Sequence, residues 1–146
     1  MNPMELALHE ARQAGLRGEV PVGAVVIGPN GAVIASAGNE SEQGLDASAH
    51  AEMVALRRAA ALRGSTRLPD CDLVVTLEPC PMCAAAIGLF RIRRLVFGAY
   101  DPKGGGVEHG VRLYESSFPH RPHEIIGGVR ETECATLLRQ FFEQLR

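Results

Sequence analysis

Two short clusters of metal-binding residue types constrain what this 146-residue chain can fold into. The first runs from His50 to Glu52, and the second runs from Pro79 to Cys83. Imidazole nitrogen and thiolate sulfur are zinc ligands, and three protein ligands leave a tetrahedral ion one position for water. His50, Cys80 and Cys83 therefore form a candidate metal site, and Glu52 is the acid or base that such a water needs.

The spacing within each cluster refines this prediction. Cys80 and Cys83 lie three apart across a helix start marked by Pro81, so both can bind one ion, while His50 comes from another helix. Helix N-termini carry partial positive charge, which favours thiolates. Residues two apart do not face each other on a regular helix, so we expect His50 at the very mouth of its helix, where it can converge with Glu52. A Cys-x-x-Cys pair alone fits a redox pair or a structural zinc knuckle equally well.

Composition limits the class of protein. With 46% hydrophobic and 22% charged side chains, the chain is typical of one soluble globular domain, residues 1–146. No apolar run approaches the roughly 18 to 20 residues of a membrane span, and residues 1–15 lack the pattern of a signal peptide. We therefore expect a cytoplasmic protein without a membrane partner. The net charge of −2 gives no global electrostatic support for nucleic-acid binding, so any such contact must be local.

The cysteines favour a reducing compartment. Cys71, Cys80, Cys83 and Cys134 are too few and too unevenly spaced for the disulfide framework of a small secreted domain. Cys71 lies at the start of an apolar strand pattern and Cys134 lies in an apolar helix stripe. Each is therefore expected to be a small core residue rather than a metal ligand.

Alternating helix and strand patterns predict the fold. Helices are expected at 3–14, 48–62, 81–90 and 134–145, and strands at 22–27, 32–37, 73–77, 94–99 and 125–126. Strand, helix, strand, helix, strand implies parallel pairing with right-handed crossovers and helices on both faces. We therefore expect an α/β fold, a three-layer α/β/α domain with a mixed sheet of about five strands.

Local features add detail to the predicted elements. Ser48 is a plausible N-cap for the second helix, and Leu62 is expected to end its buried stripe. Residues 101–122 are Gly-rich and irregular, with one helical turn expected near 111–114. Loops of this length are usually functional or mobile.

The two clusters resemble the signature of the cytidine-deaminase-like zinc enzymes, His-x-Glu followed by Pro-Cys-x-x-Cys. Over nearly the whole chain, the match narrows to the bacterial tRNA-specific adenosine deaminases. Further landmarks of that family lie at residues 18–25, 39, 46–52, 75–84, 96–99, 101–103 and 133–142. The resemblance implies the cytidine-deaminase-like version of the α/β/α fold.

The resemblance also implies a reaction. It makes His50, Cys80 and Cys83 the ligands of one zinc ion per subunit and makes Glu52 the proton shuttle. The implied chemistry is hydroxide attack at C6 of adenine and loss of ammonia, which leaves inosine at the wobble position of the anticodon. General acid and base help of this kind contributes about 10²- to 10⁴-fold.

Substrate contacts are implied in the same way. Asn39 is similar to the side chain that hydrogen-bonds the base, and the backbone of Ala51 is a second candidate. The implied partner is the tRNA anticodon stem-loop, bound by a homodimer in which the partner subunit helps to shape the groove. The stretches 104–110 and 120–123 depart from the family pattern where the anticodon loop is expected to lie.

Two alternatives stay open at this point. The first is a deaminase of a free base or nucleoside, such as guanine or cytosine, which should close over its ligand. The second is a non-catalytic, zinc-stabilised binding module, which needs a fourth protein ligand. The basic residues Arg91, Arg93 and Arg94 suit a phosphate backbone or, equally well, a solvated helix end.

Overall fold

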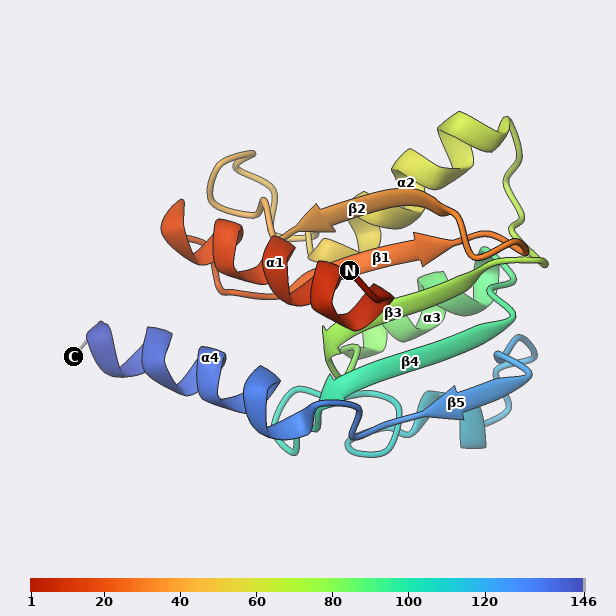
Figure 1. Cartoon of the computed structure of the whole chain (residues 1–146). Coiled ribbons are helices and arrows are strands. Elements are labelled where there is room, and N and C mark those ends of the chain that lie inside the picture. Colours follow the sequence, from red (N-terminus) through yellow and green to blue (C-terminus); the bar gives the residue numbers. More distant parts are fainter. Residues whose placement is uncertain (146) are drawn as a thin grey trace.

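The computed structural model describes residues 1–145, which form a five-stranded mixed sheet (Figure 1). Its strands are β1 (Gly23–Ile27), β2 (Val33–Gly38), β3 (Asp72–Leu77), β4 (Arg94–Ala99) and β5 (Glu124–Ile126). Their spatial order is β2-β1-β3-β4-β5. β1 pairs antiparallel with β2 and β3, whereas β4 pairs parallel with β3 and β5. The predicted mixed sheet of about five strands is confirmed.

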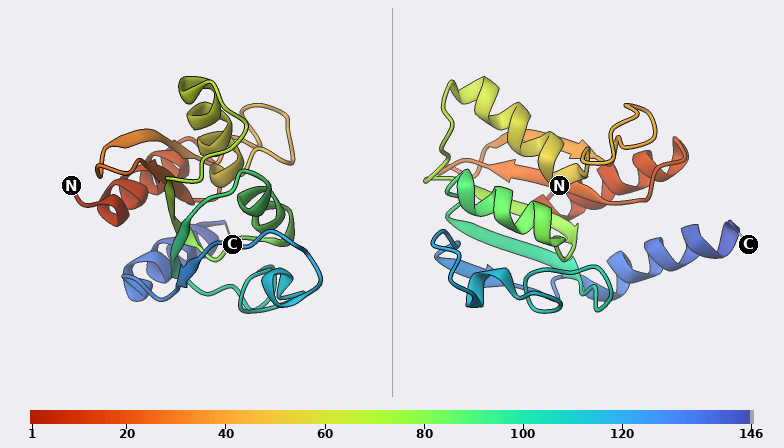
Figure 2. Two further views of the ribbon diagram at one scale, coloured as in Figure 1. Left: turned by 90° about the vertical axis from the view of Figure 1, so that its right-hand side faces the viewer. Right: turned by 180° about the vertical axis from the view of Figure 1, so that it is seen from behind.

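Four α-helices of the described residues cover the sheet, two on each face (Figures 1 and 2). They are α1 (Pro3–Leu16), α2 (Ala51–Arg63), α3 (Pro81–Leu89) and α4 (Glu131–Gln144). α1 and α4 lie on one face, and α2 and α3 lie on the other. Successive side chains of β1 alternate between the two cores: Ala24 and Val26 enter the α2–α3 core, whereas Val25 and Ile27 enter the α1–α4 core. The predicted three layers are therefore confirmed.

The first helix begins as its sequence predicts. The Asn2 side chain accepts a hydrogen bond from the Glu5 backbone N–H at 2.9 Å, and Pro3 occupies the first helical position. α1 then packs so closely on β1 that a Cβ atom at Gly23 would overlap the carbonyl oxygen of Ala7. Glycine at this position is therefore required by packing rather than by a turn.

The predicted parallel pairing needs one correction. β3, β4 and β5 do pair in parallel, as expected. β2 and β3 run in the same direction but do not pair, because β1 folds back along β2 and lies between them. The crossover through α2 therefore connects β2 to β3, two parallel strands with β1 between them, rather than two neighbouring strands.

Two details predicted for the second helix are wrong. Its N-cap is His50 rather than Ser48, whose hydroxyl instead donates to the Asp46 carboxylate at 2.7 Å. Leu62 is 72% exposed, and the buried positions of α2 include Leu56 and the carboxyl group of Glu52 instead. The buried face of α2 therefore includes the Glu52 and Leu56 side of the helix and ends before Leu62.

Residues 100–123, between β4 and β5, are irregular except for the 3-10 turn η1 (Leu113–Glu115), close to the turn predicted at 111–114. The buried Tyr114 hydroxyl donates to the Ala84 carbonyl at 2.6 Å and so ties this segment to α3. The C-terminal half of α4 extends beyond the sheet (Figure 1), and Phe142 is 46% exposed there. Among residues 1–145, no helix is both long enough and apolar enough to span a bilayer.

Candidate metal centre

α2 and α3 begin at the same edge of the sheet because the strands before them run in the same direction. His50 is the N-cap of α2, and Cys80 is the N-cap of α3. Both residues have extended backbone, and neither side chain caps its own helix, so imidazole and thiol are free for other partners. Two helix N-termini therefore meet at one place, as predicted, and their partial positive charges favour bound anions.

The three predicted ligand residues converge. The Nδ1 atom of His50 lies 3.5 Å from the Sγ atoms of both Cys80 and Cys83. The possible ligand atoms of the three residues all lie within 4.8 Å of one another. A tetrahedral zinc ion, with bonds of about 2.0–2.1 Å to nitrogen and about 2.3 Å to sulfur, separates such atoms by about 3.6 Å. The donor set and its spacing thus fit zinc.

The start of α3 explains how the two thiols meet. Cys80 at the N-cap and Cys83 at the third helical position face the same side of the first turn, as the two partners of a capping box do. A hydrogen bond from the Cys83 thiol and the nearby His50 lower the pKa of Cys80 to about 4, whereas the Cys80 thiolate and burial raise the pKa of Cys83. In the metal-free pair, Cys80 therefore carries the negative charge.

Glu52 is the second residue of α2, within its first turn, and is only 4% exposed. Burial raises its pKa to about 7, and the neighbouring Cys80 thiolate adds to the rise while His50 opposes it. A carboxyl group whose pKa lies near neutrality can both take and return a proton at physiological pH. The expectation that His50 stands at the helix mouth, with Glu52 inside the first turn, is confirmed.

The two residues predicted to contact substrate contact each other. The Asn39 Oδ1 atom accepts a hydrogen bond from the Ala51 backbone N–H at 2.7 Å. Asn39 follows β2 directly, so its amide caps α2 from outside the helix, a role that the side chain of the N-cap residue usually fills. This contact places Asn39 beside the turn that carries His50 and Glu52.

Two buried carboxylates that sequence reasoning did not single out hold the loops on either side of this centre. Glu19 is 1% exposed and accepts hydrogen bonds from the backbone N–H groups of Glu42 and Gln43, at 3.1 and 2.8 Å. Glu78 is 2% exposed and holds residues 101–109 in the same manner. An acidic residue directly after the buried strand β3 is a local sign that Glu78 is unusual, although it does not show which loop the carboxylate holds.

The basic residues after α3 do not face the metal ligands. They follow the C-terminus of α3, whereas Cys80 and Cys83 lie at its N-terminus. Arg93 pairs with Asp72 at 3.0 Å and Arg94 pairs with Glu124 at 2.8 Å. The interpretation as a solvated helix end, rather than a phosphate contact at the centre, is therefore favoured.

The comparisons with known proteins agree with this geometry. The model of the zinc-binding region of cytidine and deoxycytidylate deaminases matches residues 2–99. A tRNA-specific adenosine deaminase of Agrobacterium fabrum strain C58 is 53% identical over 143 residues, which are 98% of this chain and 93% of that protein. A solved structure from studies of A-to-I editing by tRNA:A34 deaminases has a TM-score of 0.90 at 52% identity, covering 93% of this chain and 98% of that one. A guanine deaminase from Nitrosomonas europaea has a TM-score of 0.77 at 25% identity, covering 95% and 82%.

The α/β/α fold and the His-Cys-Cys centre beside a buried glutamate define a zinc-dependent hydrolytic deaminase. The chain belongs to the cytidine and deoxycytidylate deaminase family and, within it, to the tRNA-specific adenosine deaminases.

Proposed function

We propose that this protein hydrolyses adenosine to inosine at the wobble position of a tRNA anticodon, as one deaminase domain over residues 1–146. The observation that carries the proposal is the convergence of three zinc-type ligands beside a buried carboxyl group. The identity of 53% to a tRNA-specific adenosine deaminase supports the choice of substrate.

His50, Cys80 and Cys83 would hold the zinc ion through one nitrogen and two sulfur atoms. When bound, zinc supplies Lewis acidity, which lowers the pKa of a water in its open position to about 7. Glu52 takes a proton from the attacking water and delivers it to the leaving amino group, so that ammonia departs from C6 and inosine remains. A pKa raised by burial suits both halves of this transfer.

Asn39 is proposed to orient the base. Its Oδ1 atom is occupied by the Ala51 N–H, so its Nδ2 group remains as the donor that can face a substrate. Among the described residues, no protein acceptor pairs with Nδ2. A ring nitrogen of adenine would satisfy it, whereas the Ala51 N–H is already used.

Neither alternative function fits as well. A structural zinc module needs four protein ligands, whereas the cluster in residues 1–145 has three. A free-base deaminase gains some support from the guanine deaminase neighbour, but that identity is 25% against 52% for the A34 deaminase structure. RNA recognition of this type requires a single-stranded loop whose target base can be turned outward.

A homodimer is proposed from the surface of α3. This helix has no charged residue from Pro81 to Leu89, and a helix that is apolar all round is normally buried on all sides. Yet Met82 and Leu89, two turns apart on one side, are 37% and 57% exposed. A second copy covering this side would bury both.

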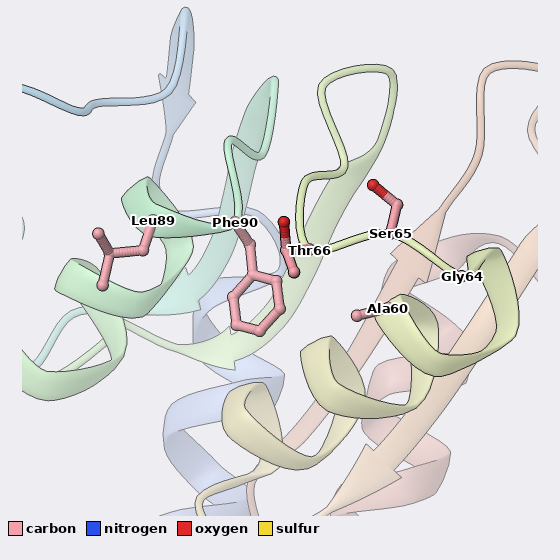
Figure 3. A pocket seen from close by; sticks show the side chains of 6 residues that line it. All are labelled: Ala60, Gly64, Ser65, Thr66, Leu89 and Phe90. Carbon is pink, nitrogen blue, oxygen red and sulfur yellow. The ribbon is translucent and has the colours of Figure 1, made fainter.

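A hollow of about 510 Å³ continues this surface (Figure 3). It is lined by Ala60, Gly64, Ser65, Thr66, Leu89 and Phe90. In Figure 3 the Phe90 ring lies between the end of α3 and α2, on the opposite side from Leu89. The hollow lies at the C-terminal ends of α2 and α3, about 20 Å along α2 from its metal-ligand end, so it belongs with the proposed dimer surface rather than with the metal centre.

The direct experiment is incubation of the purified zinc protein with an anticodon stem-loop that carries adenosine at position 34, followed by nucleoside analysis. Inosine is the expected product, and the same stem-loop with guanosine at position 34 is the control.

We also propose that the protein acts in the cytoplasm, because tRNA is present there and the four free cysteines suit a reducing compartment.

A further inference from the structure

The Glu78 carboxylate accepts five hydrogen bonds from one short loop, residues 101–109, which is called the clasped loop here. Oε1 accepts from the Asp101 N–H at 3.0 Å and from the His109 ring at 2.8 Å. Oε2 accepts from three successive backbone N–H groups, those of Val107, Glu108 and His109, at 3.2, 2.9 and 3.0 Å. All the usual acceptor positions of this carboxylate are therefore used by a single segment.

The carboxylate is enclosed, and no Arg or Lys side chain pairs with it among the described residues. Its side chain has 0% exposure. Backbone dipoles and one imidazole thus compensate the buried charge, in the way that an anion is held by successive amides. Losing these donors would leave a charge in the interior, so the loop and the carboxylate are held to each other strongly.

The clasped loop touches the segment that carries the metal ligands. The Gly106 N–H donates to the Pro79 carbonyl at 2.8 Å, and a Cβ atom at Gly106 would lie 2.7 Å from the Pro81 nitrogen. A Cβ atom at Gly105 would lie 2.5 Å from Glu78 Oε2. The loop therefore lies directly against the residues on both sides of Cys80.

We propose that Glu78 is a positioning residue for the RNA substrate: it fixes the clasped loop as a preformed wall of the groove without touching the reacting atoms. This inference rests on the function proposed above. Holding the loop in advance removes the ordering cost that substrate binding would otherwise carry. Release of the loop is therefore expected to weaken RNA binding more than it slows the chemical step.

Loop release can be measured without any catalytic assay. Lys103 is the only lysine in the chain and lies within the clasped loop, so a lysine-specific endoprotease can cut only there. Cleavage of a native protein follows the population of the opened segment. Glu78→Gln puts an amide donor among the loop's own donors and should raise the rate of cleavage after Lys103 about tenfold or more, the scale set by loss of one hydrogen bond to a charged group.

The matched control is Glu108→Gln, which removes the same charge from the same loop, where only the backbone of Glu108 contacts Glu78. It should be cleaved at the wild-type rate. An arginine-specific protease should cut Glu78→Gln no faster than wild type, because the rest of the fold stays closed. Should Glu78→Gln fold poorly, His109→Ala removes only one of the five hydrogen bonds and should give a smaller rise at Lys103.

The kcat and KM of the same variants are then measured on the anticodon stem-loop that carries adenosine at position 34. Glu78→Gln should raise KM about tenfold or more while kcat changes less than about threefold and zinc content stays at one per chain. Three results for Glu78→Gln would each overturn the inference. They are an unchanged rate of cleavage after Lys103, an equal rise in the rate of cleavage after the arginines, and a fall in kcat at constant KM. A wild-type protein that is inactive on RNA would refute the proposed function. The cleavage rates would still test whether Glu78 holds the clasped loop in place.

Discussion

The Oδ1 atom of Asn39 accepts a hydrogen bond from the backbone N–H of Ala51 at 2.7 Å. The bond joins the end of β2 to Ala51, the first residue of α2, which lies between the proposed metal ligand His50 and the buried Glu52. The two residues that the family resemblance implied as substrate contacts therefore act as one unit. One half of the Asn39 amide holds the helix, and the other half is available to a base.

Asn39→Asp and Asn39→Ala are predicted to separate these two tasks. The aspartate keeps an acceptor for the Ala51 N–H but lacks the amide donor, so kcat/KM on the stem-loop should fall about ten- to a hundredfold with little change in Tm. The alanine loses both, and loss of a helix cap should in addition lower the free energy of unfolding by about 1 kcal/mol. Equal activity of the aspartate variant and wild type would contradict the role of Nδ2.

Glu52→Gln is predicted to keep zinc and lose turnover. The glutamine fills the same space but cannot move a proton, so kcat should fall about 10²- to 10⁴-fold. Zinc content, measured by elemental analysis, should stay at one per chain because Glu52 is not a ligand. Glu40→Gln, at a partly exposed position paired with Arg58, is the control and should be fully active.

Removal of zinc is predicted to expose one reactive thiol. In the metal-free protein, the pKa of Cys80 is lowered to about 4, whereas burial raises the pKa values of Cys71 and Cys134 to about 11. Iodoacetamide at pH 6.5 should therefore modify Cys80 first after chelation, as identified by peptide mass spectrometry. The zinc-loaded protein should resist, and preferential labelling of Cys71 would argue against the site as described.

Zinc affinity is predicted to fall as the pH falls. Hydrogen bonding to Cys80 raises the pKa of His50, and the pKa of Cys83 is also raised, so both are protonated in the metal-free protein under mildly acidic conditions. Zinc must displace each bound proton, which costs about tenfold in affinity per pH unit for each group that carries one. Competition with a chromophoric chelator at pH 8, 7 and 6 should show a loss that steepens as the pH falls through the raised pKa of His50.

The exposed apolar side of α3 is predicted to be a dimer surface. Leu89→Glu places a charge on this side and should shift the protein from a dimer toward a monomer of 15.6 kDa in light scattering. Leu16→Glu is the matched control, since Leu16 is 82% exposed at the end of α1 on the other face of the sheet. A wild-type protein that is monomeric at micromolar concentration would rule the surface out.

Much of this structure could be predicted because its signals are local. The apolar runs of β1 and β3 and the Pro81 helix start need only neighbouring residues to be interpreted, and few sites other than zinc centres combine these ligand types at this spacing. The chain order of strands and helices could not reveal that β1 lies between β2 and β3, because that depends on where the hairpin folds back.

The roles of the buried carboxylates depend on contacts between distant segments. Glu78 meets residues about thirty positions away, and Glu19 meets residues more than twenty positions away, so no local pattern marks either as an anion holding a loop. Ser48 is a reasonable cap by residue type, but the side chain of Asn39, which directly follows β2, takes that role at α2. Long-range hydrogen bonds thus account for the features of the site that the sequence alone does not predict.

The most direct measurement is a side-by-side assay of one zinc-loaded preparation on the position-34 adenosine stem-loop, free guanine and free cytosine, with inosine and ammonia quantified together. A His50-Cys80-Cys83 centre beside an RNA-binding groove predicts that the stem-loop yields inosine and an equal amount of ammonia. It also predicts that the free bases release no ammonia. Ammonia from guanine or cytosine with no inosine in the RNA would contradict it.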